Sequence, residues 1–392
     1  MRNVRTSFAK GKPIYCGIDT HKDTWTVVVR CQREEIYRAT IPADVERLVA
    51  RLKGFEASEI HTVYEAGPTG YSLHDGLEKA GCDSMVVPPT KVPQVQDRVK
   101  TDHRDGRKLA EMLEGGHFRG ITIPTLEQRA QRQLYRTREQ VMKHRKQTQN
   151  QIKSMLLFHG VKPPAKLCTA RWSQAYLRWL ETLSWDQEEL KVSMGALLNL
   201  YHHLDQMVKS LEQKFEALAK TGKHRENTQL TRTIPGIGIH TAMALAVELG
   251  DVSRFKKEAL LPSYIGLTPS ERSSGQRVRK GSITRCGNPR LRKLFVESSW
   301  TLIRRDPKAR ETYDRIKQHT GSGNKAIVAV ARRLTLCVRR MLLDRVPYEM
   351  GMKGGAHKDP NQEQGQLLPA ATAMMAHPGV KRYVLKKNTC EN

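Results

Sequence analysis

The chain has 392 residues, and its 67 Lys and Arg against 40 Asp and Glu give a formal net charge of +27 and a pI of about 10.0. Solubility does not require such an excess, which favours a polyanionic partner, most often nucleic acid. No long apolar run, lipidation signal or signal peptide is present, so we expect neither a membrane protein nor an exported one, but a cytoplasmic one. The seven cysteines form no CxxC pair, which excludes the usual zinc motifs and fits reduced thiols.

Residues 12–125 have the pattern of an α/β domain. Three strand-like runs come first, then helices and strands alternate, and the last helix begins near Asp102. A strand meander followed by helix, strand, helix, strand, helix is the element order of a RuvC-like (ribonuclease-H-like) fold. The runs are strands at 14–19, 24–30, 35–40, 60–65 and 84–88, and helices at 45–52, 73–80 and 102–113.

Four acids in this region stand where metal chemistry is possible. Asp102 and Asp105 are three apart in a first helical turn, so they share one face and repel each other unless a cation lies between them. Acidic residues are also common at a helix N-terminus because they interact favourably with the helix dipole. These two residues alone therefore do not decide between a metal site and a helix-dipole interaction. Asp19 and Glu65 each end a strand-like run, and in the predicted order those strands are neighbours. Taken together, the four carboxylates indicate a Mg²⁺-binding site. Two such ions about 3.5–4 Å apart would stabilise the attacking and leaving oxygens of a phosphoryl transfer.

Residues 126–226 are predicted to be a helical region with a coiled coil. From 126 to 158 the residues are helix-prone, with eight Lys and Arg against two Glu, a bias that favours a nucleic-acid contact. From Leu190 to Leu218 apolar residues recur at alternating spacings of four and three, the a/d seam of a coiled coil. A helix packed within its own domain is the alternative, and the partner helix is expected from the same chain or from a second subunit.

Residues 227–346 are predicted to form a mainly helical C-terminal domain, and residues 347–392 a flexible tail. In this domain the sequence Pro235–Gly238 before a small-residue helix is a helix-hairpin-helix signature. There Gly236 and Gly238 let backbone N–H groups approach a phosphate, although a tight turn that binds nothing has the same pattern.

The most basic stretch runs from Ser270 to Arg345, with 20 Lys and Arg against 6 Asp and Glu. Its first part reads as a loop or hairpin in which hydroxyls and glycines stand among arginines. A serine there, Ser273 or Ser274, is able to attack a phosphodiester in principle, but a serine beside Gly275 in a basic loop usually just contacts phosphate. The predicted nucleic-acid contacts are Arg272, Arg277, Arg279, Lys280, Arg285 and Arg292.

Six motifs occur in an order that resembles the DEDD transposases of the insertion sequence one-ten family. The resemblance covers roughly residues 14–343 and implies a RuvC-like domain, a coiled-coil linker and a C-terminal transposase domain. The motifs are Gly17–Asp23, Tyr64–Gly70, Lys100–Asp105, Ile234–Gly238, Gly266–Pro269 and Ser274–Gly275.

The resemblance also implies a mechanism and partners. Asp19, Glu65, Asp102 and Asp105 would hold Mg²⁺ ions, and Ser274, which precedes the glycine of the motif, would form a covalent phosphoserine link to DNA, with Ser273 left as a neighbouring candidate. Members that this chain resembles are recombinases guided by an element-encoded bridge (or seeker) RNA that pairs with donor and target double-stranded DNA. Their active site is composite between subunits, which implies a homo-oligomer, dimer or tetramer, in a bacterial or archaeal cytosol.

Two other functions share some of these features. A RuvC-like Holliday-junction nuclease would use the acids with water as the nucleophile and would not need Ser274. A non-enzymatic nucleic-acid-binding protein would keep the acids for structural reasons only. A DDE transposase is disfavoured, because its third acid is expected much farther downstream than Asp105.

Overall fold

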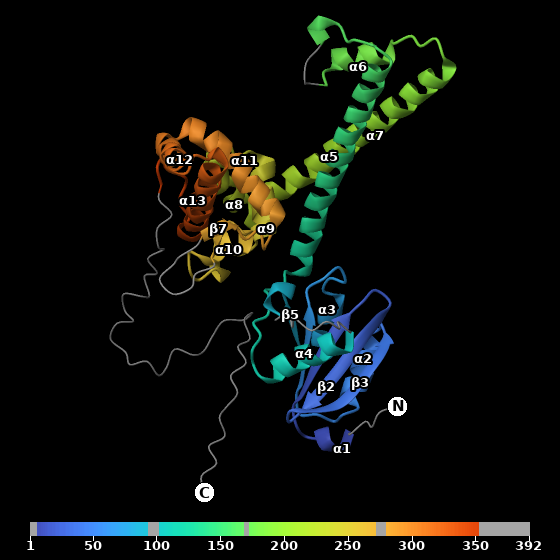
Figure 1. Ribbon diagram of the computed structural model, residues 1–392, viewed down its shortest axis with the longest axis vertical. Helices are drawn as coiled ribbons and strands as arrows, with labels where there is room; N and C mark the ends of the chain where they lie inside the picture. Colours follow the sequence, from blue (N-terminus) through green and yellow to red (C-terminus); the bar gives the residue numbers. More distant parts are fainter. Residues whose placement is uncertain (1–5, 93–101, 168–171, 272–279, 353–392) are drawn as a thin grey trace. The chain divides into compact units, whose positions relative to one another are not determined.

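The computed structural model describes residues 6–92, 102–167, 172–271 and 280–352 (Figure 1). These residues belong to two compact units that meet in sequence between Ile123 and Pro124. The N-terminal unit is a mixed α/β domain, and the C-terminal unit is mostly helical. Each unit is described by itself.

A single five-stranded sheet forms the centre of the N-terminal unit, with strand order β3-β2-β1-β4-β5. The first three strands make the predicted antiparallel meander, and β4 and β5 continue the sheet parallel to β1. The strands are β1 (Ile14–Thr20), β2 (Thr24–Cys31), β3 (Glu34–Pro42), β4 (Ile60–Glu65) and β5 (Asp83–Val87). The helices are α1 (Thr6–Ala9), α2 (Val45–Lys53), α3 (Ser72–Lys79), η1 (Pro89–Lys91) and α4 (Asp102–Glu114).

Helices cover both faces of this sheet, which explains why its central strands are almost wholly buried. On one face, Leu48 and Leu52 of α2 and Leu77 of α3 pack with alternate residues of β1. On the other face, α4 packs Leu109 and Leu113 against β4 and β5. Residues two apart in a strand point to the same side, so β1 contributes to both cores.

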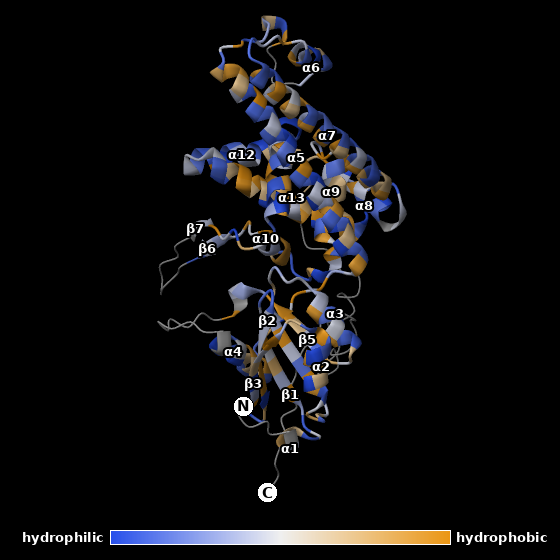
Figure 2. Ribbon diagram, turned by 90° about the vertical axis from the view of Figure 1, so that its right-hand side faces the viewer, coloured by the Kyte–Doolittle hydropathy of each residue, from blue (hydrophilic) through white to orange (hydrophobic). Residues whose placement is uncertain are grey.

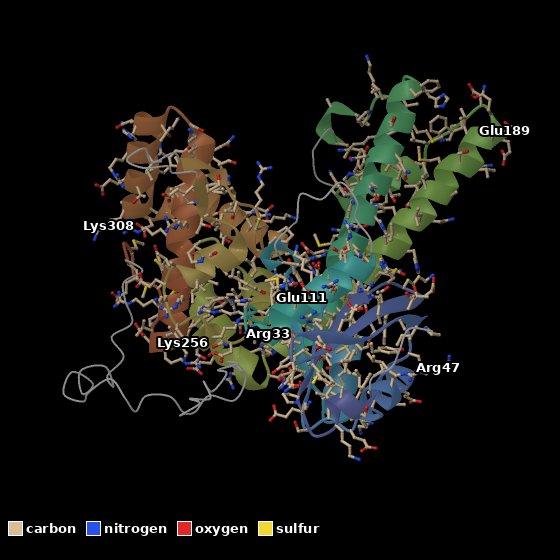
Figure 3. The ribbon with its side chains drawn as sticks, turned by 60° about the horizontal axis from the view of Figure 1, so that its bottom comes forward. Arg33, Arg47, Glu111, Glu189, Lys256 and Lys308 are labelled. Carbon is tan, nitrogen blue, oxygen red and sulfur yellow. The ribbon has the colours of Figure 1, made fainter. Side chains whose placement is uncertain are left out.

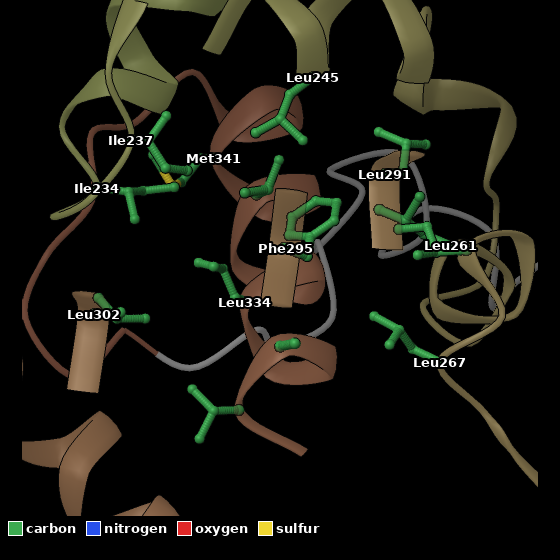
Figure 4. Close-up of a cluster of buried hydrophobic side chains, with 14 of the residues drawn as sticks. Ile234, Ile237, Leu245, Leu261, Leu267, Leu291, Phe295, Leu302, Leu334 and Met341 are labelled. Carbon is green, nitrogen blue, oxygen red and sulfur yellow. The ribbon is translucent and has the colours of Figure 1, made fainter. Parts of the chain in front are cut away.

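The C-terminal unit is built from helices around one main core. Phe295 of α11 lies in this core with residues of α9, α10 and α13, and Figure 4 shows Leu245, Leu261 and Leu334 around it. The elements are α5 (Leu126–Phe158), η2 (Ala165–Leu167), α6 (Gln174–Glu181), α7 (Glu188–Ala219), α8 (Gly222–Arg232), α9 (Ile239–Leu249), η3 (Val252–Arg254), α10 (Leu260–Ile265), β6 (Pro269–Glu271), β7 (Lys280–Ile283), α11 (Pro289–Arg305), α12 (Pro307–Thr320) and α13 (Gly323–Asp344).

The heptad pattern belongs to α7, and its partner is α5 of the same chain. The two long helices lie side by side (Figure 2). Tyr135 of α5 stacks on Phe215 of α7 with ring centroids 5.7 Å apart. The buried face of α7 does not match the predicted heptad along its whole length. Leu198 is buried, whereas Leu197, the residue that the heptad predicts to be buried, is only partly buried. There α7 packs against α6 as well as α5, so three helices meet and a strict two-helix coiled coil is not confirmed.

Residues just past the predicted C-terminal boundary at 346 still pack on the helical core. Tyr348 and Met352 lie against the core cluster, and the Tyr348 hydroxyl donates a hydrogen bond to the buried carboxylate of Asp306. The C-terminal unit therefore extends at least to Met352, and the rest of the predicted tail lies outside the described residues. Within the described ranges, none of the helices has the length and apolar character needed to span a membrane.

Candidate active site and nucleic-acid interface

Asp19, the second-last residue of β1, and Glu65, the last residue of β4, lie at the same end of two neighbouring parallel strands. Ile18 of β1 is paired in register with Tyr64 of β4, so the next residue of each strand comes to the same edge of the sheet. Both acids are half-buried, and a carboxylate oxygen of Asp19 lies 3.4 Å from Nε2 of His21. The prediction that these acids stand on adjacent strand ends is confirmed.

The loop after β4 is tied back to this edge. The Tyr64 hydroxyl donates to the carbonyl of Gly70 at 3.1 Å, and the hydroxyls of Thr20 and Thr69 are 3.3 Å apart. The backbone N–H of Ala66 donates to the carbonyl of Val87 at 2.7 Å. The loop that follows Glu65 therefore has a fixed path beside the end of β1.

Helix α4 lies directly on β1 because two glycines face each other. A Cβ atom on Gly17 would come 2.1 Å from the carbonyl oxygen of Gly106 and 2.4 Å from the backbone nitrogen of Ala110. No side chain fits there without moving the helix. Sequence reasoning did not use this contact, although a glycine inside a helix costs about 1 kcal/mol relative to alanine and so indicates a packing reason.

An ion-pair cluster fixes the same helix on β2. The buried guanidinium of Arg30 donates to Glu111 at 3.1 Å and to Glu114 at 2.9 Å, two acids on α4 (Figure 3 labels Glu111). Together with the glycine contact, this cluster determines the position of α4 along the sheet. Asp105 immediately precedes Gly106 and is half-buried.

The donor set at this edge suits a hard divalent cation, since carboxylate oxygens are the ligands that Mg²⁺ prefers. Asp102 is the first residue of α4, but its side chain lies outside the described residues. Among the side chains that are described, no group of three or more His, Cys, Asp or Glu comes close enough to hold a metal ion. The described carboxylates of Asp19, Glu65 and Asp105 therefore do not form a metal cluster by themselves, and the four-acid site, which also needs Asp102, stays a prediction.

The serine-bearing segment is bracketed by a small hairpin in the C-terminal unit. Strands β6 and β7 pair antiparallel, with Glu271 opposite Lys280, so residues 272–279 connect the two strands. The predicted site residues Arg272, Ser273, Ser274, Arg277 and Arg279 lie outside the described residues, as does the side chain of Lys280.

The foot of this hairpin is held by hydrogen bonds within the chain. Arg292 of α11 donates to the carbonyl of Ile265 at 2.9 Å and to that of Arg285 at 3.2 Å. Arg285 is itself exposed, with a left-handed φ of 55°. Arg292 thus has an internal structural role that its sequence context did not indicate, and nucleic-acid binding by it and by Arg285 stays a prediction.

A fully buried carboxylate, Glu248 of α9, joins α9 to α5 and to the start of α11. Arg136 of α5 contacts both of its oxygens, at 2.9 and 3.1 Å, and the Asn288 amide donates to it at 2.8 Å. Asn288 also caps α11 by accepting hydrogen bonds from its first backbone N–H groups. Burial alone raises the pKa of Glu248, but the hydrogen bonds and charge of Arg136, with Asn288 and Arg132, outweigh it and hold that pKa below its ordinary value.

Two family models match this chain over the elements just described. A model described as "Transposase", of the IS110 DEDD type, matches residues 16–160, which include the strand-end acids and α4. A model described as "Transposase IS116/IS110/IS902 family" matches residues 228–314, which include Glu248 and the hairpin. The chain belongs to the IS110 family of transposases. Transposases are DNA-processing enzymes.

Curated relatives agree with this family. The chain is 30% identical over 263 residues to y4qE of Sinorhizobium fredii, named as a transposase, with 66% of this chain and 62% of that protein aligned. It is 26% identical over 301 residues to the transposase for insertion sequence element IS1533 of Leptospira borgpetersenii, with 74% and 85% aligned. The match to the IS1111A transposase of Coxiella burnetii is 28% over 229 residues, 57% and 60% of the two chains. The aligned part thus spans less than two thirds of the first and third relatives.

The predicted helix-hairpin-helix turn of this IS110-family chain lies between α8 and α9. Gly236 has a left-handed φ of 95°, and a Cβ atom on it would come 2.6 Å from Cβ of Thr301 on α11. Packing within the protein therefore requires glycine at this position. Gly238 is the residue before α9, and a Cβ atom on it would meet no other atom within 4 Å, so that side of the turn is open. A phosphate contact at this turn stays a prediction.

The basic face predicted on α5 is largely used inside the protein. Arg136 pairs with Glu248, Arg138 with Glu212, and Arg145 with Asp205. These partners lie far along the sequence, on α7 and α9, so local charge counting missed them. Three lysines of the predicted set, Lys143, Lys146 and Lys153, are exposed.

Proposed function

We propose that this protein is the transposase of an insertion element and that it cleaves and rejoins DNA strands with a RuvC-like acidic site. The observation that carries the proposal is the close contact of Gly17 with Gly106, which holds α4 over the strands that end in Asp19 and Glu65. A sheet of three antiparallel strands extended by two parallel ones is compatible with a ribonuclease-H-like fold.

The acids would bind divalent metal, with Asp19, Glu65 and Asp105 joined by Asp102 from the first turn of the helix. Bound Mg²⁺, two ions in the fullest form of the proposal, would supply stabilisation for negative charge on the attacking and leaving oxygens. The chain's own contribution would be to bring carboxylates from two strands and one helix to one edge of the sheet. Arg30, Glu111 and Glu114 serve this by fixing the helix.

In the proposed reaction, the Ser274 hydroxyl attacks the phosphorus of a phosphodiester. A bond forms from Ser274 Oγ to phosphorus, the bond from phosphorus to one deoxyribose oxygen breaks, and that oxygen takes up a proton in exchange for the one the serine loses. A second strand's hydroxyl then attacks the phosphoserine and releases the serine, so no external energy source is needed. Arginines near the serine, such as Arg277, would stabilise charge on the transferring phosphoryl group.

We also propose that the working enzyme is a homo-oligomer, in which the acids of one subunit meet the serine of another. The heptad seam of α7 faces α5 of the same chain, so it is not the obvious contact surface. A second row on α7, formed by Val192, Leu200 and Met207, is exposed at near-heptad spacing and is the candidate contact between subunits.

A guide RNA encoded by the element would choose the donor and target sequences by base pairing, and the protein would bind backbones. The net charge of +27 supports a partner with many phosphates. Replacing Arg277 or Arg279 should then weaken binding to all targets alike. A changed target consensus in either variant would contradict this division of roles.

The deciding experiment incubates the full-length protein with Mg²⁺, donor and target duplexes and RNA transcribed from the element's flanks, followed by denaturing gels. An adduct of protein and DNA that is lost in Ser274→Ala but kept in Ser273→Ala supports the proposal. Cleavage without an adduct would favour a nuclease that uses water. If Asp105→Asn had no effect on any strand transfer, the acids would be structural, and the protein would be a binding protein only.

A further inference from the structure

The corner where α11 meets α12 presents a tryptophan beside a group of cations. Trp300 is 41% exposed, and Arg304 follows it by one helical turn, on the same face of α11. The centroid of the Trp300 ring lies 5.9 Å from that of Tyr313 on α12, at an interplanar angle of 60°. The indole is thus braced on one side by a buried tyrosine and open to solvent on the other.

Positive charges outnumber negative ones among the exposed side chains at this corner. Arg304, Arg305, Lys308 and Arg310 are all exposed, and Figure 3 shows Lys308 at the outer edge of the unit. Of the acids nearby, Asp306 is 1% exposed, and its carboxylate accepts hydrogen bonds from the backbone of α12 and from Tyr348. Glu297 of α11 and Glu311 of α12 are exposed, and Glu297 lies 4.0 Å from Lys293.

Few of these cations are neutralised by the chain itself. Arg310 pairs with Asp314 at 2.6 Å, but this is an exposed pair, which a phosphate can replace at little cost. In the part of the chain that the structure describes, no ion pair involves Arg304, Arg305 or Lys308. This differs from α5, where three of the arginines pair with acids of α7 and α9.

An open indole among cations is complementary to an unpaired base with its flanking phosphates. Duplex DNA shows only base edges in its grooves, whereas a single strand offers base faces that stack on aromatic rings. An acidic peptide would satisfy the cations but would give the rigid, braced indole nothing to stack on. The combination therefore favours a single strand over both alternatives.

We propose that the Trp300 corner binds an unpaired stretch of nucleic acid, with one base stacked on the indole and adjacent phosphates on Arg304 and Arg305. This goes beyond the proposed reaction, because it requires neither the metal-binding acids nor the serine. A loop of an RNA and a melted DNA strand offer the same chemistry, so both are included as separate arms of the test.

The test measures fluorescence anisotropy of labelled strands of about 16 nucleotides, the upper range for such sites, with full-length protein at about 0.1 M salt. Single-stranded RNA, single-stranded DNA and duplex DNA are compared. Trp300→Ala is expected to weaken binding of a single strand about tenfold or more and to leave duplex binding within about twofold, since stacking on one aromatic ring has that magnitude. A loss confined to RNA, or to DNA, identifies the source of the strand.

Two further variants keep the test independent of folding. Trp300→Leu retains apolar packing against Tyr313 but offers no aromatic face, so it should bind single strands as weakly as Trp300→Ala while its thermal melting stays close to wild type. Phe158→Ala removes another exposed aromatic ring, 85% exposed on α5, and should leave binding unchanged. Wild-type affinity of Trp300→Leu for single strands, or an equal loss for duplex DNA, would overturn the proposal.

Discussion

The buried carboxylate of Glu248 offers the sharpest test of how the C-terminal unit is held together. Glu248→Gln keeps the size of the side chain and one oxygen that accepts a hydrogen bond, but it removes the charge between Arg136 and Asn288. Glu248 itself is 0% exposed, so water does not replace what is lost. We expect the substitution to destabilise the junction of α5, α9 and α11.

The magnitude follows from the exposure of the partners. Removing one member of a buried, hydrogen-bonded ion pair costs about 3–5 kcal/mol, because the other charge stays buried without compensation. The Arg136 side chain is 36% exposed and is able to turn partly to water, so we expect about 2–3 kcal/mol. For a unit of this size that corresponds to a fall in Tm of about 5–10 °C.

Calorimetry of the full-length protein measures this change as a shift of one unfolding transition. The control is Asp314→Asn, which breaks the exposed Arg310–Asp314 pair and should change stability by less than about 0.5 kcal/mol. The pKa of Glu248 lies below its ordinary value of 4.5, so its stabilising effect is complete above that value and is lost as pH falls through the lower, folded-state value. The gap between wild type and Glu248→Gln should therefore be largest near neutral pH and shrink in acid. Equal shifts for both variants, or a gap that widens in acid, would refute the reasoning.

The remaining predictions concern other elements. Gly17→Ala should lower the rate of DNA strand cleavage about a hundredfold, because α4 must move away from β1 to make room for the Cβ atom. Gly195→Ala in α7, where a Cβ atom would have nothing within 4 Å, should raise the Tm measured by calorimetry slightly. Met207→Lys should reduce oligomer formation, measured by light scattering, and an unchanged mass would exclude that surface. Tyr348→Phe removes the hydroxyl that donates to buried Asp306 and should cost about 1–2 kcal/mol in denaturant unfolding, an effect that a flexible 347–352 segment would not give.

The N-terminal fold was predictable because its signals are local. In the sequence, β1 and β4 are short apolar runs bounded by polar turns, and α2 and α4 have apolar residues at helical spacing. The adjacency of Asp19 and Glu65 also followed, since parallel strand ends meet at one edge. The contact of Gly17 with Gly106 was missed because the two residues are far apart in sequence, and only the packing of α4 on β1 brings them together.

The heptad of α7 shows where a correct local pattern stops short. The pattern predicted the helix and most of its buried face, but the slip from Leu197 to Leu198 comes from α6, which the sequence pattern did not indicate. A third helix changes which residues are buried without changing the period of the sequence. The period of the sequence is also the same whether the partner helix comes from this chain or from a second subunit, so the pattern left that question open.

The basic residues of α5 and those at the corner of α11 and α12 differ in how far they are free to bind nucleic acid. Both regions have an excess of Lys and Arg, yet the arginines of α5 are paired by Glu212, Asp205 and Glu248, whereas Arg304 and Arg305 lie at an exposed corner. Only charges that meet phosphates release counterions, so each exposed contact adds about 0.7–0.9 to the slope of log K against log salt, and internal pairs add nothing. Lys143→Ala or Arg304→Ala should therefore lower that slope, while Arg145→Ala should leave it unchanged and lower stability. A lower slope for Arg145→Ala would mean that its pair with Asp205 opens to bind nucleic acid.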